Sequence, residues 1–187
     1  MVNVNETLSP TPLGLCAFGM TTILLSLCNA GYIGLTSPII AMAVFCGGIA
    51  ILITGLFEWK MNNLFGFVTF GGFAFFWLSF AGIVVLPVIG ISPAPSAIDM
   101  AAFLFVWALL ALALVICALR LGSKLLLATL VCLLLLFICL IIANIAGMAL
   151  FTILGGYVGI LTGLLALYLG VAAVINDVFK ESVCPVF

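Results

Sequence analysis

Long apolar stretches separated by short polar loops make up nearly the whole hydrophobicity pattern of this chain. A helix needs roughly 20 consecutive apolar residues to cross a hydrocarbon core of about 30 Å. Six segments meet this requirement, at residues 13–32, 38–56, 64–86, 97–119, 125–143 and 148–175. The last is long enough to span with tilt. The pattern therefore predicts an all-α integral membrane protein with six transmembrane helices.

Polar and turn-forming residues predict where these helices begin and end. We expect residues 1–12 to form a short polar tail, 13–176 a six-helix channel or transporter domain, and 177–187 a C-terminal tail. Ser37 and Pro38 resemble an N-cap followed by proline at the first helical position. The third helix is predicted to stop at Pro87, where a Pro- and Gly-rich loop begins.

The composition supports a membrane location and argues against an enzyme. Hydrophobic residues make up 68% of the chain and charged residues 5%, whereas soluble domains carry about 25% charged residues. The sequence has no His, no Cys-x-x-Cys, no Gly-x-Ser-x-Gly and no phosphate-binding or paired-carboxylate pattern. We therefore expect no enzymatic activity, no metal, no cofactor and no nucleic-acid partner.

The few positive charges predict the orientation in the membrane. With six spans, all of them fall on the side of the N-terminus: Lys60, Arg120, Lys124 and Lys180. Because positively charged loops stay in the cytoplasm, we expect both termini to be cytoplasmic. The hypothesis is a multi-pass protein of the cell (plasma) membrane.

Ionisable side chains are predicted to avoid the middle of the bilayer. Glu58 falls at the inner end of the second segment and Asp99 near the outer start of the fourth. An intramembrane charge would indicate a proton relay or an ion-coupling site. Its absence argues against an elaborate ion-coupled pump and leaves open proton movement on the substrate itself.

Glycines recur four residues apart in the sixth segment, at Gly155, Gly159 and Gly163. Such a stripe lets two helices approach closely in lipid. The favoured interpretation is packing within the bundle, and the alternative is a contact between subunits.

Polar side chains in the first apolar segment and at the end of the fifth are the candidate substrate path. Thr21, Thr22, Ser26 and Asn29 lie in the first segment, where the last three share one helix face. Asn144 lies at the end of the fifth. The hydroxyls can bond their own helix backbone, or line a pore. By the predicted topology both amides lie near the outer mouth, where they would replace part of the water shell of a small anion.

The N-terminal run resembles a known signature. Residues 9–15 read Ser-Pro-Thr-Pro-Leu-Gly-Leu, with Pro10, Pro12, Leu13, Gly14 and Leu15 matching the Asn-Pro-Ala-Pro-Leu-Gly-Leu of the acetate uptake transporter family, also called succinate–acetate permeases. The resemblance continues in order along nearly the whole chain, through Phe18-Gly19-Met20-Thr21-Thr22, Gly47-Gly48-Ile49-Ala50, Glu58, Phe76-Trp77-Leu78 and Asn144-Ile145-Ala146-Gly147.

This resemblance implies six helices per subunit, a homohexameric ring, and one pore per subunit for acetate and other small monocarboxylates, with succinate in some members. It also implies an apolar constriction built by one aromatic from the first segment, one from the third and a leucine from the fifth. The matching positions are Phe18, Phe73 and Leu133.

The chain departs from the family pattern at four positions. Ser9 replaces Asn and Thr11 replaces Ala in the signature, Phe73 stands where relatives have Tyr, and Cys28 occupies a position that can be His. The constriction then lacks a hydroxyl and is drier. These departures bear on transport rate and selectivity, and on the response to pH.

Three functions are compatible with the residues themselves. The first is a passive or proton-linked pathway for acetate, crossed by the anion or by the protonated acid. The second is a channel for a small neutral solute such as urea, an amide or ammonia. The third is a structural or signalling membrane protein without transport activity.

Overall fold

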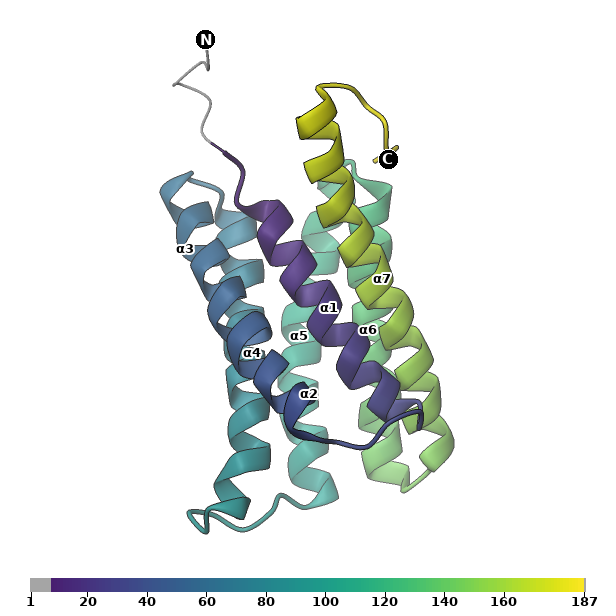
Figure 1. The fold of residues 1–187 in the computed structure, drawn as a ribbon. Helices are drawn as coiled ribbons and strands as arrows, with labels where there is room; N and C mark the ends of the chain where they lie inside the picture. Colours follow the sequence, from purple (N-terminus) through teal and green to yellow (C-terminus); the bar gives the residue numbers. More distant parts are fainter. Residues whose placement is uncertain (1–7, 187) are drawn as a thin grey trace.

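A computed structural model describes residues 8–186, and all regular structure within this range is helical. Six helical stretches are long and apolar enough to cross a membrane, as the sequence predicts. They appear in Figure 1 as α1 (Thr11–Asn29); α2 (Ser37–Met42), the π-helix η1 (Ala43–Ala50) and α3 (Ile51–Lys60), which continue one another as the second stretch; α4 (Leu64–Val88); α5 (Ala97–Leu121); α6 (Lys124–Ala146); and α7 (Ala149–Phe179).

Several helix ends differ from the predicted ones by a few residues. Helix α1 starts two residues early because Pro12 falls in the first turn, where a missing backbone N–H costs nothing. The N-cap predicted at Ser37 is wrong, since the helix already begins there and Thr36 precedes it. Helix α4 passes through Pro87 and ends one residue later, at Val88. Helix α7 continues to Phe179, beyond the predicted tail boundary.

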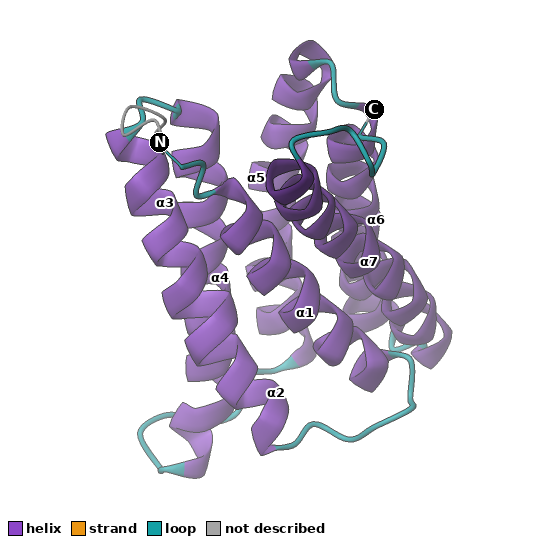
Figure 2. Cartoon of the chain, turned by 45° about the horizontal axis from the view of Figure 1, so that its top comes forward, coloured by secondary structure: helices purple, strands orange, loops and turns teal. Residues whose placement is uncertain are grey.

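Helix α1 runs between α3 and α7 in both views of the fold (Figures 1 and 2). Its most extensive contacts are with α7, while α7 packs on α6, α6 on α5, and α3 on α4. The start of α1 and the end of α7 lie at the same end of this bundle (Figure 1), here called the terminal end. The positive residues of the predicted cytoplasmic side also lie there, at the end of α3, at the α5–α6 junction and after α7.

Glycines hold α1 against α7. A Cβ added at Gly19 would lie 2.6 Å from the Gly163 carbonyl oxygen, and one added at Gly163 would lie 2.7 Å from the Gly19 carbonyl oxygen. A Cβ at Gly159 would lie 2.1 Å from Ser26 Oγ. The two backbones therefore meet at a distance that only glycine permits. The favoured interpretation of the glycine stripe is packing within the bundle. It is confirmed for Gly159 and Gly163.

Aromatic rings fill the space between α4, α5 and α6. Phe76 contacts Phe103 and Trp107 of α5 at centroid distances of 5.7 and 5.5 Å, and Phe137 of α6 at 5.5 Å. Phe73 stacks on Phe137 with an interplanar angle of 15°. Ring pairs of this kind contribute about 0.5–1.5 kcal/mol each beyond their buried area, so the cluster fixes the orientation of Phe73.

We expect Gly163→Ala to destabilise the bundle by about 1–3 kcal/mol, because the added methyl group presses on backbone atoms that cannot move aside. Thermal unfolding in detergent, followed by tryptophan fluorescence, measures the loss as a lower midpoint. Gly82→Ala is the matched control, since its Cβ meets only the end of Leu86 at 4.0 Å. Equal midpoints for Gly163→Ala and wild type would show that α1 and α7 are not held by this contact.

Candidate functional site

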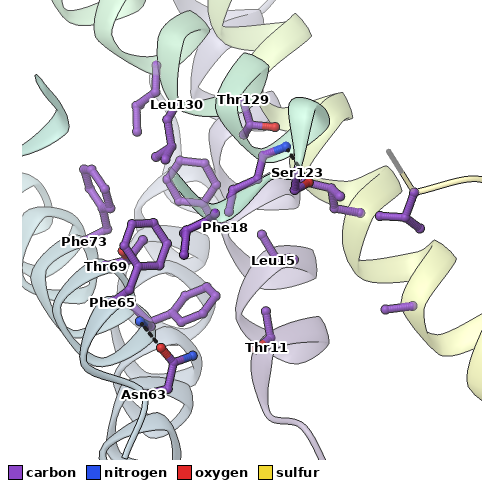
Figure 3. A pocket seen from close by; sticks show the side chains of 18 residues that line it. Thr11, Leu15, Phe18, Asn63, Phe65, Thr69, Phe73, Ser123, Thr129 and Leu130 are labelled. Carbon is purple, nitrogen blue, oxygen red and sulfur yellow. Dashed lines mark hydrogen bonds between the residues drawn. The ribbon is translucent and has the colours of Figure 1, made fainter. Parts of the chain in front are cut away.

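A large cavity of about 370 Å³ lies between α1, α4 and α6, with further lining from α7. Figure 3 shows residues from the first three helices around it. Its wall is mostly apolar. The polar lining side chains are few: Thr11, Asn63, Thr69, Ser123 and Thr129. Thr11 is the first residue of α1, and Asn63 and Ser123 are the N-caps of α4 and α6. This cavity therefore lies at the terminal end of the bundle.

A small cavity of about 30 Å³ lies further along the same three helices. Thr22, Ser26 and Asn29 of α1 line it, together with Phe76 and Trp77 and with apolar residues of α6. A single water molecule needs roughly 10–15 Å³ of such space. The small cavity therefore has room for about two water molecules.

Three side chains line both cavities, and they are Phe18, Phe73 and Leu133. They are 8%, 2% and 3% exposed, and the Phe18 and Phe73 ring centroids are 5.7 Å apart. These are the three residues that the family resemblance assigns to the constriction. The structure thus brings them together as a dry partition between the two cavities.

The structure places some of the predicted path residues at a cavity and others away from both cavities. Thr22, Ser26 and Asn29 face the small cavity, as their shared helix face predicts. Thr21 instead donates to the Ala17 carbonyl at 2.8 Å, and Asn144 donates to the Leu140 carbonyl at 2.8 Å. Neither of these two side chains lines either cavity. Both side chains instead form a hydrogen bond to a carbonyl of their own helix, which is the alternative to lining a pore.

Three buried polar atoms along this route have no hydrogen-bond partner among the described residues: Thr22 Oγ1, Trp77 Nε1 and Thr69 Oγ1. Thr22 and Trp77 line the small cavity and Thr69 the large one. An unpaired buried donor costs about 1–3 kcal/mol, so these atoms are available to water or to a polar solute. The sequence analysis did not single out Trp77 or Thr69 as path residues, although Thr69 is the sole threonine of an aromatic helix.

The signature residues shape the start of α1. A Cβ at Gly14 would lie 2.6 Å from the Phe70 ring and 2.7 Å from Thr54, so this glycine lets α1 lie close to α3 and α4. Leu15 lines the large cavity. Pro10 is the N-cap residue of the helix, and Pro12 lies in its first turn.

The structure buries Glu58, which the hydrophobic pattern did not predict. It lies near the terminal end, as predicted, but its side chain is only 2% exposed. Its carboxylate accepts hydrogen bonds from the Thr11 hydroxyl and from Asn63 Nδ2, the latter at 2.7 Å. Both donors line the large cavity. A buried carboxyl group thus stands directly behind the wall of the candidate path.

The C-terminal tail folds back over the terminal end of the large cavity. Asn176 donates to the Cys184 carbonyl and accepts from the Cys184 N–H, both at 2.8 Å. The Tyr168 hydroxyl donates to the Pro185 carbonyl at 3.0 Å. Val186 completes the lining of the cavity, so these bonds hold the tail beside its mouth.

Comparison with known proteins agrees with this arrangement. The sequence model of the GPR1/FUN34/yaaH family matches residues 2–186. The chain belongs to the GPR1/FUN34/yaaH family. This confirms the resemblance stated from the signature and from the motifs that follow it.

Relatives of this chain include proteins named for succinate and acetate transport and for ammonia transport. The chain is 39% identical to the succinate-acetate/proton symporter SatP of Escherichia coli K12, over 95% of this chain and 94% of the other. It is 34% identical to ammonia transport outward protein 2 of Saccharomyces cerevisiae, over 88% of this chain and 61% of the yeast protein. A solved structure of the bacterial acetate channel SatP superposes with a TM-score of 0.95 at 38% identity, covering 97% of this chain and 100% of that one.

We expect Asn176→Ala to release the C-terminal tail, because it removes both hydrogen bonds to Cys184. Two neutral hydrogen bonds contribute about 1 kcal/mol each, so the rate at which a water-soluble maleimide labels Cys184 should rise roughly tenfold or more. Cys184→Ser identifies the labelled site by mass. Asp177→Asn is the control, since it changes only the exposed ion pair with Lys180. Unchanged labelling in Asn176→Ala would contradict the proposed restraint.

Proposed function

We propose that this protein is a membrane channel or transporter for acetate and related small monocarboxylates, including succinate, by a passive or proton-linked route. The main observation behind this proposal is that Phe18, Phe73 and Leu133 separate two cavities that follow one another along the bundle. The likeness to the succinate-acetate/proton symporter and to the solved acetate channel supplies the substrate class.

The proposed route enters the large cavity at the terminal end, passes the three-residue ring and continues through the small cavity. Removing a carboxylate from water costs several kcal/mol unless polar groups replace the lost hydration. Unpaired donors lie on both sides of the ring, with Thr69 on one side and Thr22 and Trp77 on the other. An anion is therefore dry only while it passes the ring, which makes this ring the constriction.

The assembly proposed for this function is a homohexamer with one pore per subunit, in the cell membrane, with both termini in the cytoplasm. The positive residues gathered at the terminal end support this orientation. Large apolar side chains on the outer faces of the helices, such as Phe105 and Leu109 of α5, which are 54% and 51% exposed, suit lipid or neighbouring subunits.

Ammonia is the second candidate, because a yeast relative is named as an ammonia transporter. A neutral molecule crosses a dry aromatic ring with less loss of hydration than an anion does. Ammonia accepts a hydrogen bond through one lone pair, whereas a carboxylate accepts through two oxygens, so the several unpaired donors favour the carboxylate.

The test is uptake of labelled acetate by liposomes that hold the pure protein, with an ionophore clamping the membrane potential. We expect uptake that saturates and exceeds that of empty vesicles. Dependence on potential with little dependence on pH identifies the anion as the permeant species, whereas uptake that follows the protonated fraction identifies acetic acid or a proton-coupled step. Fast ammonia or urea entry without acetate uptake would reject the carboxylate assignment in favour of a neutral-solute channel.

We expect Phe73→Tyr to increase acetate flux about fivefold, because a hydroxyl in the dry ring gives the passing carboxylate a hydrogen bond of about 1 kcal/mol. Initial rates in the same liposomes measure the effect. Phe103→Tyr adds the same hydroxyl within the aromatic cluster, away from both cavities, and should leave the rate unchanged. A rate for Phe73→Tyr equal to that of the control would show that the ring does not limit transport.

A further inference from the structure

We propose that the large cavity is a binding site for linear monocarboxylates of about six to eight carbons, which it holds more tightly than acetate. The carboxylate of such a ligand lies at Thr69, next to the ring, and its alkyl chain extends along the apolar wall toward the mouth. This rests on the proposed function and names a further class of ligand for the same path.

The large cavity is far bigger than acetate requires. Its volume is about 370 Å³, whereas a single water molecule needs roughly 10–15 Å³ of such space. Cavities of about 300–1,000 Å³ with mostly apolar walls and a few polar groups are typical of sites for larger organic ligands. Among the described residues, no charged side chain lines this cavity. Its size and its wall therefore suit a hydrocarbon chain.

Thr69 supplies the polar end of this site. The hydroxyls of Thr129 and Thr162 each donate to the carbonyl four residues earlier, at 2.8 Å. Thr69 also lies inside a helix, but its Oγ1 is buried and has no hydrogen-bond partner among the described residues. Hydrogen bonds to a charged acceptor are stronger than those to a neutral one. The hydrogen of Thr69 is therefore available to a carboxylate in the cavity.

The register of α4 places this hydroxyl deep in the cavity. Asn63, the N-cap of α4, lies at the mouth. Thr69 is six residues further along, which is roughly 9 Å along the axis at 1.5 Å per residue. Phe73 follows Thr69 by four residues and lines the same cavity, so the two side chains share one face of α4 (Figure 3). A carboxylate at Thr69 therefore lies directly before the ring.

Glu58 determines which way round the ligand binds. Its carboxylate accepts hydrogen bonds from Thr11 and Asn63, both of which line the mouth. A ligand carboxylate at the mouth would lie close to this negative charge, and like charges repel more strongly at short distance. At Thr69 the ligand carboxylate is nearly two turns of α4 deeper than Asn63. The uncharged alkyl chain therefore occupies the mouth side.

Apolar side chains line the cavity between Thr69 and the mouth. They include Leu15 of α1, Leu126 of α6, and Leu169 and Ala173 of α7. A hydrocarbon chain advances roughly 1.3 Å per carbon, from a C–C bond of about 1.5 Å. The span of roughly 9 Å thus accommodates about seven carbons beyond the carboxyl group, which is the chain of octanoate. Longer acids reach water at the mouth, where further methylenes are not buried.

Dehydration of the carboxylate does not distinguish these ligands from acetate. Every linear monocarboxylate brings the same charged group to Thr69, so the loss of hydration there is common to the series. Only the chain differs, and each methylene moved from water to an apolar wall strengthens binding by about fourfold. Affinity therefore rises with chain length up to about eight carbons and then levels off.

The experiment measures how unlabelled butyrate, hexanoate, octanoate and decanoate inhibit labelled acetate uptake in the same liposomes, at pH 7.5 on both sides. We expect the inhibition constant to fall by about two- to fourfold per methylene from butyrate to octanoate, and to change little for decanoate. Empty vesicles with the same acid measure leakage, which is subtracted.

Ala173→Phe tests the site of the alkyl chain, because the added ring fills part of the wall that the chain would contact. We expect it to lower the preference for octanoate over butyrate by about tenfold. Val174→Phe is the matched control, since it adds the same ring to a side chain that is 49% exposed on the outer face, and it should keep the wild-type series. If Ala173→Phe does not fold, Ala173→Leu and Val174→Leu make the same comparison.

Thr69→Val tests the site of the carboxylate, because it removes the hydroxyl at similar volume. We expect it to raise every inhibition constant by about fivefold and to leave the dependence on chain length unchanged. Thr69→Ser keeps the hydroxyl and should restore the wild-type values. Thr162→Val is the control, since Thr162 lines neither cavity and bonds its own helix.

Equal inhibition constants for butyrate and octanoate in wild type overturn the proposal. A chain-length series that is the same in Ala173→Phe and Val174→Phe also overturns it, because partition into the bilayer then explains the trend. Wild-type acetate flux no greater than that of empty vesicles refutes the proposed function instead. In that case the thermal unfolding midpoint in detergent decides on the site: octanoate should raise it more than butyrate in wild type but not in Ala173→Phe, and equal shifts overturn the proposal.

Discussion

The close contact of α1 with α7 is the constraint on which the rest of this structure depends. Lipid is as apolar as a leucine side chain, so helices in a bilayer are held by close packing and not by exclusion from water. At Gly19 and Gly163 the two backbones approach as closely as glycine allows. Helix α1 carries Phe18 of the ring and the polar side chains of the small cavity, so the position of this one helix affects the geometry of both. Gly14 fixes its other side against Phe70 of α4.

The aromatic cluster complements that contact from the opposite wall. Helices α4 and α5 touch little through their backbones, and Phe76 and Trp107 fill the space between them. Phe73 is stacked on Phe137 and cannot rotate freely. The ring therefore consists of one side chain held by glycine packing, one held by aromatic packing, and Leu133 on α6. These three side chains carry no polar atom, so they offer a passing solute no hydrogen bond.

Much of this fold follows from hydrophobic pattern alone, because a bilayer allows few alternatives to a spanning helix. The six spans and the gathering of Lys60 and Lys180 at one end could be predicted in this way. Which side of a helix faces the pore could not, since lipid and a dry pore wall select the same apolar residues. Thr21 and Thr22 are adjacent in the sequence, yet one bonds its own backbone and the other faces the small cavity. The burial of Glu58 depends on the turn at Asn63 and on the absence of a side chain at Gly66, contacts that periodicity does not describe.

The distribution of unpaired polar atoms explains how a wall so apolar can serve a charged solute. A pore lined with strong donors throughout would bind a carboxylate too tightly to release it, and one without donors would exclude it. Here the donors are few, separated and neutral: Thr69 precedes the ring, and Thr22 and Trp77 follow it. Each can replace part of a hydration shell. No hydrogen bond within the protein has to break first, because these atoms are buried without partners. On the proposed route, a solute therefore lacks a hydrogen-bond partner only while it crosses the three apolar side chains between these donors.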